Sequence, residues 1–142
     1  MDFLSSMEIS ASGLNAQRTR MSVIADNLAN ASTTRTDAGG PYRRKDVVFK
    51  DAGGFGKLMN GMSGRAKAGV SVEGITEDSS PFKKVFDPGH PDADKSGYVS
   101  MPNVSAPTEM VNLVSATRSY QANLAAISAA KSMAEKALEI GK

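Results

Sequence analysis

The fold is decided by residues 106–140, APTEMVNLVSATRSYQANLAAISAAKSMAEKALEI. Steps of four and three along this stretch pick out one series that is mostly apolar: Leu113, Thr117, Tyr120, Leu124, Ile127, Lys131, Ala134 and Leu138. Such spacing is typical of one face of an α-helix. Pro107 suits the first helical turn, and Glu109 complements the positive end of the helix dipole. The sequence therefore predicts a helix over residues 106–140.

A second long helix is predicted near the other end of the chain. Its apolar residues recur every seven positions, at Met7, Leu14, Met21 and Leu28, and this series is flanked at spacings of three or four by Leu4, Ala11, Ile24, Ala25 and Ala31. This period indicates a helix from about Ser5 to about Ala31, roughly 40 Å long at 1.5 Å per residue. We expect the two helices to pair as a coiled coil, with both apolar series in the seam.

The middle of the chain has a different composition. Gly and Pro occur repeatedly there, as in Gly39-Gly40-Pro41 and Asp87-Pro88-Gly89, and such residues interrupt long helices. Four short segments have strand-like patterns: Lys45–Lys50, Gly69–Ile75, Lys83–Phe86 and Tyr98–Met101. The predicted fold is mainly α, with long N- and C-terminal helices (residues 1–34 and 105–142) and an inserted Gly/Pro-rich region with short β-strands (residues 35–104).

Both predicted helices lack the charged face of an ordinary surface helix. No charged residue occurs between Arg118 and Lys131, and the positions off the seam are small, mostly Ala and Ser. Gly13 in mid-helix costs about 1 kcal/mol relative to Ala. A plain two-helix hairpin is one explanation, but it has little interior. We therefore expect packing against other chains, with residues 5–31 and 106–140 becoming ordered on assembly.

Composition excludes several classes of function. The net charge is +2, from 17 basic and 15 acidic residues, which is too balanced for a nucleic-acid or anionic-membrane binder. The chain has no Cys, so neither disulfides nor thiolate metal sites are possible. No run approaches the roughly 20 apolar residues of a membrane span, and no cleavable signal is apparent at the start of the chain.

Three motifs suggest ligand chemistry but are incomplete. Asp92-Ala93-Asp94-Lys95-Ser96-Gly97 matches the first half of an EF-hand calcium loop, but the twelfth position is Asn103 where Glu is required. His90 has no His or Cys nearby, which favours a loop residue over a metal ligand. The basic run Arg43-Arg44-Lys45 is typical of a solvated loop or a salt-bridging contact. We predict no catalytic residue, cofactor site, metal site or small-molecule substrate.

Several motifs resemble those of the flagellar rod and hook proteins. The N-terminal signature of that family is matched by Leu14-Asn15-Ala16-Gln17-Arg18 and by Ile24-Ala25-Asp26-Asn27-Leu28-Ala29-Asn30-Ala31. Further stretches are similar to those of the proximal rod subunits: Pro41-Tyr42-Arg43-Arg44-Lys45, residues 87–104, Glu109-Met110-Val111-Asn112-Leu113, Arg118-Ser119-Tyr120-Gln121-Ala122-Asn123 and Lys131-Ser132-Met133. The match is weakest over residues 51–80.

This resemblance implies a structural subunit of the basal-body rod, located where the rod crosses the cell envelope, that transmits torque toward the hook. It implies export by the flagellar type III apparatus, contacts with MS-ring and rod-base proteins, and assembly with other rod subunits and copies of itself. In that setting the two apolar series form packing surfaces, and four residues form polar contacts: Asn27, Asn30, Gln121 and Asn123. Another axial subunit of the rod or hook junction is an alternative, and an enzyme or ligand-binding domain would instead need a polar pocket.

Overall fold

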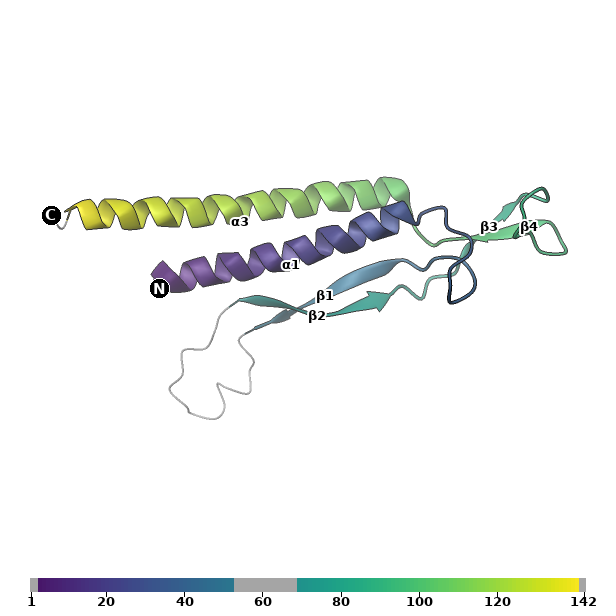
Figure 1. The fold of residues 1–142 in the computed structure, drawn as a ribbon, viewed down its shortest axis with the longest axis horizontal. Coiled ribbons are helices and arrows are strands. Elements are labelled where there is room, and N and C mark those ends of the chain that lie inside the picture. The colour runs from purple at the N-terminus through teal and green to yellow at the C-terminus, as the bar shows by residue number, and fades with distance from the viewer. Residues whose placement is uncertain (1–2, 53–68, 141–142) are drawn as a thin grey trace, which may run out of the picture.

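The computed structural model describes residues 3–52 and 69–140. Two long helices enclose, in chain order, four short strands (Figure 1): α1 (Phe3–Ala29), β1 (Lys45–Asp51), β2 (Val70–Glu77), β3 (Lys83–Phe86), β4 (Tyr98–Met101) and α3 (Ala106–Ile140). The predicted mainly helical fold with short strands is confirmed. The strand predictions agree for β3 and β4, and differ by one or two residues at the ends of β1 and β2.

The helices run antiparallel, side by side (Figure 1). Helix α3 has the predicted bounds, whereas α1 begins and ends about two residues earlier than predicted. Asn30 explains where α1 ends, because its side-chain Nδ2 donates to the Asp26 carbonyl at 2.9 Å. Its backbone carbonyl accepts from Thr33 N at 3.1 Å, and this bond closes a turn. The chain therefore leaves the helix after Ala29.

Small residues bring the two helices together. The side chains of Ala16 and Ala116 are buried, and so is that of Ala130. A Cβ atom added to Gly13 would lie only 2.8 Å from Asn123 Nδ2, so Asn123 occupies the space that the glycine leaves. On α3 the positions that face α1 recur every seven residues: Glu109, Ala116, Asn123 and Ala130.

The strands form two separate antiparallel ribbons. In the first, β1 pairs with β2 and contains an irregularity between Val48 and Phe49. In the second, β3 pairs with β4, and Val99 of β4 is buried. The β1–β2 ribbon packs on α1, while the β3–β4 ribbon projects beyond the ends of the helices (Figure 1).

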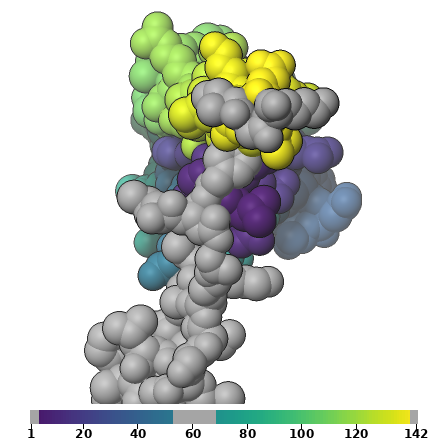
Figure 2. Space-filling model, turned by 90° about the vertical axis from the view of Figure 1, so that its left-hand side faces the viewer, coloured from purple at the N-terminus to yellow at the C-terminus, as the bar shows by residue number. Residues whose placement is uncertain are grey.

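The helix pair and the first ribbon form three layers, with α1 in the middle. Both views show α3 on one side of α1 and strands on the other (Figures 1 and 2). Because α1 separates α3 from the β1–β2 ribbon, only one side of α3 is covered by the described part of the chain. Neither α1 nor α3 combines the length and hydrophobicity of a membrane-spanning helix.

Candidate functional site

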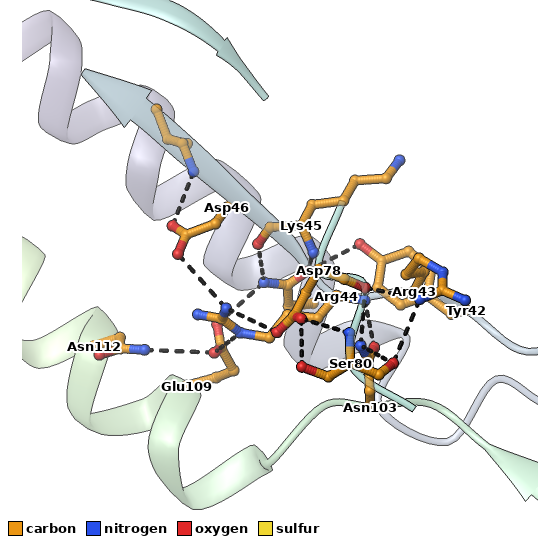
Figure 3. Close-up of polar contacts among 12 residues, drawn as sticks. Tyr42, Arg43, Arg44, Lys45, Asp46, Asp78, Ser80, Asn103, Glu109 and Asn112 are labelled. Carbon is orange, nitrogen blue, oxygen red and sulfur yellow. Dashed lines mark hydrogen bonds and ion pairs between the residues drawn. The ribbon is translucent and has the colours of Figure 1, made fainter. Parts of the chain in front are cut away.

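A buried polar cluster joins the helix pair to the strands. We use this name for Asn27, Tyr42, Arg44, Asn103 and Glu109 (Figure 3). Glu109 lies in the first turn of α3 and is only 1% exposed. Its Oε1 accepts a hydrogen bond from Arg44 Nε at 2.9 Å, and its Oε2 accepts one from Asn27 Nδ2 at 3.1 Å. The carboxylate is therefore paired and hydrogen-bonded, as a buried charge must be.

Asn27 is fully buried near the end of α1 and uses its whole amide. Its Nδ2 also donates to the Lys45 carbonyl at 2.8 Å. Its Oδ1 accepts from the Lys45 amide at 2.9 Å and from the Tyr42 hydroxyl at 3.0 Å. Four hydrogen bonds saturate the amide, so one side chain ties α1 to the start of β1 and to α3.

Arg44 connects the cluster to the segment between the two ribbons. Its guanidinium lies between three carboxylates. In addition to the bond from Nε to Glu109, Nη1 is 3.5 Å from Asp46 Oδ2 and 3.7 Å from Asp78 Oδ2. Its amide donates to Asn103 Oδ1 at 2.8 Å, and Asn103 Nδ2 donates in turn to the Asp78 carbonyl at 3.2 Å. Arg44 of the basic run is thus a salt-bridging residue, one of the two possibilities open from sequence.

The surroundings shift the acidity of two cluster members. The hydrogen bond to Glu109 raises the pKa of the Arg44 guanidinium above its ordinary value. Burial raises the pKa of the Tyr42 hydroxyl, and the negative charges of Asp26, Glu77 and Glu109 add to this rise. Both groups therefore keep their protons near neutral pH, so both remain donors.

A second candidate surface lies on the uncovered side of α3. Large apolar residues are exposed along the length of α3, and we call this set the apolar surface: Met110, Val111, Val114, Leu124, Met133 and Leu138. Three of them, with Ser115, Arg118 and Ser119, line a shallow open groove of about 450 Å³. Exposed apolar residues in such numbers mark an interaction surface.

The residues of the two predicted apolar series lie at different depths in the free chain. Ile24 is buried, while most others are half-buried at the edge of the helix interface: Met7, Leu14, Met21, Leu28, Leu113, Tyr120 and Ile127. Met21 Sδ accepts a hydrogen bond from Thr117 Oγ1 at 3.6 Å, across the interface. Leu124 and Leu138 are 52% and 76% exposed, so packing for these two remains a prediction about the assembly.

The four predicted polar residues separate into different places. Asn27 belongs to the polar cluster, and Asn30 closes the turn after α1, where its Oδ1 also accepts from Thr33 Oγ1 at 3.2 Å. Asn123 packs against Gly13, and Gln121 is exposed on α3. The structure thus brings Asn27 alone of the four into the cluster.

The segment that resembles half an EF-hand is a turn stabilised by its own carboxylates. Asp94 Oδ1 accepts hydrogen bonds from the backbone amides of Ser96 and Tyr98, at 2.8 and 2.9 Å. Asp92 Oδ2 accepts one from Thr34 Oγ1 at 2.8 Å. In residues 3–52 and 69–140, no three His, Asp or Glu side chains are grouped so as to hold a metal ion.

Sequence patterns did not reveal the contacts of Arg44, Tyr42 or Gly13. Each acts through a partner far along the chain: Arg44 is 65 residues from Glu109, and Gly13 contacts Asn123 on the other helix. The available signals were a mid-helix glycine and a lone acidic residue in the first turn of α3. The acidic residue is explained by the helix dipole, and the glycine indicated close packing without indicating its partner, so neither signal identified these contacts.

These features define a class of protein: an elongated helical subunit with a buried polar cluster between its helices and strands, and an apolar surface that the described part of the chain leaves uncovered. Family models agree with this class. Residues 7–35 match the model described as "Flagella basal body rod protein". Residues 95–140 match the model described as "Flagellar basal body rod FlgEFG protein C-terminal".

Curated relatives are similar over the full length of the chain. The flagellar basal-body rod protein FlgC of Bacillus subtilis is 52% identical, over 96% of this chain and 97% of its own. The proteins of the same name from Escherichia coli O6:H1 and Aquifex aeolicus are 44% and 39% identical, over 100% of this chain and 100% and 99% of theirs. The chain belongs to the FlgC family of flagellar basal-body rod proteins.

Proposed function

We propose that this chain, a structural subunit of the flagellar basal-body rod, is built into the rod wall through its helix pair. There it transmits torque mechanically from the MS ring toward the hook, and so contributes to swimming motility. Its role is passive packing with no catalytic step. The names of its relatives, all basal-body rod proteins, support this role.

The apolar surface of α3 is the observation that carries the proposal. Single exposed leucine or valine side chains are normal on a protein surface. Burying one against a neighbouring subunit stabilises the complex by roughly 25 cal/mol per Å² of apolar surface removed from water. No charged residue lies between Arg118 and Lys131 to solvate this side of the helix. Between Arg118 and Lys131, α1 covers one side of the helix and no charge solvates the others, so this stretch is suited to contact several neighbours at once.

The remaining features of assembly extend this proposal. The two helices pair as a coiled coil in the assembled rod, with segments 1–34 and 105–142 forming the wall and segment 35–104 contacting neighbours outside it. The partners are other rod subunits, copies of this chain, the MS-ring and rod-base proteins, and the flagellar type III export apparatus. The proximal position within the rod follows from the sequence resemblance alone, and the rod is favoured over the hook junction because the relatives named above are basal-body rod proteins.

The substitution Leu124→Asp tests the proposal. Leu124 is 52% exposed in the free chain, so the aspartate should change the free energy of unfolding of the monomer by no more than about 0.5 kcal/mol. In the assembled wall the same carboxylate would be buried without a partner, which is strongly unfavourable. We expect normal secretion, no incorporation into basal bodies and loss of swimming.

The matched control is Lys95→Asp, in the exposed turn before β4. It introduces the same side chain on the ribbon that projects away from the helices, and it should incorporate almost normally. Secreted and basal-body-bound subunit are quantified separately in cells that express each variant. Wild-type swimming by the Leu124→Asp strain would show that this side of α3 faces solvent, and the proposed packing would be wrong.

A further inference from the structure

We infer that two copies of this chain dock head to tail through surfaces that the free chain leaves exposed. The aromatic pair of one copy, which we define as Phe86 and Tyr98 on the β3–β4 ribbon, enters the apolar groove on α3 of the second copy. Asp87 pairs there with Arg118 of the second copy. This contact names one interface of the proposed wall, so its place in the rod rests on the proposed function. The fit of the two surfaces follows from the free chain alone.

The aromatic pair is exposed but held in place. Phe86 and Tyr98 are partners across the ribbon, and their rings meet edge to face with centroids 5.3 Å apart. A Cβ atom added to Gly97 would lie only 2.9 Å from Phe86 Cε2, so the phenyl ring fills the space beside this glycine. The two aromatic side chains are nevertheless 63% and 44% exposed. Aromatic side chains that are already fixed lose little conformational entropy on binding, and they commonly anchor protein interfaces.

The ribbon carries the aromatic pair away from the helices of its own chain. It projects beyond their ends (Figure 1), and in the described part of the chain neither β3 nor β4 packs on α3. The pair therefore does not reach the groove of its own chain, and a second molecule has to supply one. Residues 88–96 form the loop beyond the pair, so the exposed Lys95 in this loop lies outside the contact.

The groove on α3 is apolar and has a positive charge at one end. Met110, Val111 and Val114 line it, and its volume of about 450 Å³ is within the usual range of binding clefts. Arg118 lies one turn beyond Val114 and forms no ion pair within residues 3–52 and 69–140. An aromatic side chain that enters this groove removes apolar surface of both copies from water, which favours association.

Charge sets the orientation in which the two surfaces meet. Asp87 directly follows Phe86, just as Arg118 lies next to the apolar residues of the groove. Asp87 accepts a hydrogen bond from the Gly89 amide at 3.2 Å, but it has no ion-pair partner among the described residues. An apolar anchor beside an anion thus meets an apolar groove beside a cation. Such complementarity determines orientation and encounter rate more than affinity.

The geometry of this contact favours a helical array of copies. The copies meet through different surfaces, so the contact is heterologous. The aromatic pair lies beyond the end of the helices at which α3 begins (Figure 1), whereas Val114 lies further along α3 than Ala106. With parallel long axes, the second copy is therefore displaced along them by at least about 12 Å, from 1.5 Å per residue. A heterologous contact repeated with this displacement builds an open helix instead of a closed ring.

Disulfide cross-linking tests the contact, and the chain has no cysteine of its own to interfere. Full-length Lys84→Cys and Ser115→Cys chains, one of them labelled with heavy isotopes, are mixed at high concentration and oxidised with copper phenanthroline. Lys84 lies two residues before Phe86 on the same face of β3, and Ser115 lines the groove. We expect mass spectrometry to detect a mixed dimer that joins residues 84 and 115.

Lys83→Cys is the matched control for Lys84→Cys. It removes the same charge from an exposed position of β3, but successive strand residues point to opposite faces of the ribbon. It should give at least about fivefold less mixed dimer with Ser115→Cys, because its thiol points away from the groove. Equal yields from the two lysine variants, or no mixed dimer from Lys84→Cys, would overturn the inference.

Exchanging the two charges tests the orientation of the copies. Arg118→Glu in the Ser115→Cys chain places a carboxylate opposite Asp87, and the like charges should lower the yield of mixed dimer at least about fivefold. Asp87→Arg in the Lys84→Cys chain should restore most of that yield. Arg18→Glu, at an exposed arginine of α1, is the control and should leave the yield unchanged. If Asp87→Arg restores nothing, or if Arg18→Glu lowers the yield equally, the pairing of Asp87 with Arg118 is wrong.

Isolated basal bodies separate this inference from the proposed function. The Lys84→Cys and Ser115→Cys variants are expressed together in cells, and the basal bodies are isolated, oxidised and analysed in the same way. If the subunit is present there but no dimer joins residues 84 and 115, the contact is refuted while the proposed function stands. If the unsubstituted subunit is absent from basal bodies, the proposed function fails and the measurement in solution still decides the contact.

Discussion

Replacing Arg44 by alanine should destabilise the free subunit more than any surface substitution. Arg44 supplies the guanidinium on the Glu109 carboxylate, which is 1% exposed. Without it, Glu109 keeps the hydrogen bond from Asn27 at 3.1 Å and a weak one from Asn112 at 3.4 Å, but no opposite charge. Breaking one side of a buried ion pair costs about 3–5 kcal/mol. We expect a loss of free energy of unfolding near the lower end of this range, because the Arg44 side chain is itself 22% exposed.

Urea unfolding of the monomer, followed by circular dichroism, measures this loss. Arg18→Ala is the control, because Arg18 is an exposed residue of α1, and its change should stay within about 0.5 kcal/mol. Arg44→Ala combined with Glu109→Gln should recover part of the stability, since the double variant has no unpaired buried charge. If Arg44→Ala lowers the free energy of unfolding by less than about 1 kcal/mol, or if the double variant recovers no stability, the ion pair between Arg44 and Glu109 is not the main bond of the polar cluster.

Two further predictions concern acid and helix packing. Hydrogen bonds from the Tyr98 and Ser96 amides lower the pKa of Asp94, and those from Ser80 lower that of Asp78, below the ordinary 3.8. The ionised forms of these two carboxylates therefore stabilise the fold fully well above pH 3.8, and this contribution is lost as the pH falls below that value. The thermal unfolding temperature of Asp94→Asn should consequently change less between pH 5 and pH 3 than that of the unsubstituted protein. Gly13→Ala should raise the free energy of unfolding by about 1 kcal/mol, from its better helix propensity, only when Asn123 is also replaced by alanine. Urea unfolding measures this gain with and without Asn123→Ala, and equal gains in the two cases would contradict the close contact between Gly13 and Asn123.

Elements with a local signal were predictable from the sequence. Pro107 indicated where α3 begins, and the four-three spacing with Gly141 after it indicated where α3 ends, while the Gly and Pro residues of the middle segment separated the four strands. The repeat of seven in α1 was also visible, but its buried face includes Ala16, Val23 and Asn27, next to the predicted series. Periodicity locates a large apolar series more readily than a face of small residues, and it is small residues that let these two helices approach.

The polar cluster could not be predicted, for a different physical reason. Its residues are polar, so they carry no hydrophobic period, and they come from segments that only the finished fold brings together. Asn27, Arg44 and Glu109 each have a satisfactory local explanation, as a motif residue, part of a basic loop and a dipole-compensating acid. A buried ion pair forms only when folding removes both partners from water together. The residues next to each partner in the sequence therefore do not indicate that the pair will form.

The antiparallel course of the helices has a practical consequence for labelling this protein in cells. The start of α1 and the end of α3 lie toward one end of the molecule, and the β3–β4 ribbon lies at the other (Figure 1). A fluorescent or epitope tag on either terminus is therefore carried at the same end of the molecule. A short tag inserted beside the exposed Lys95 would be carried at the far end. Reporters of rod construction belong in that turn.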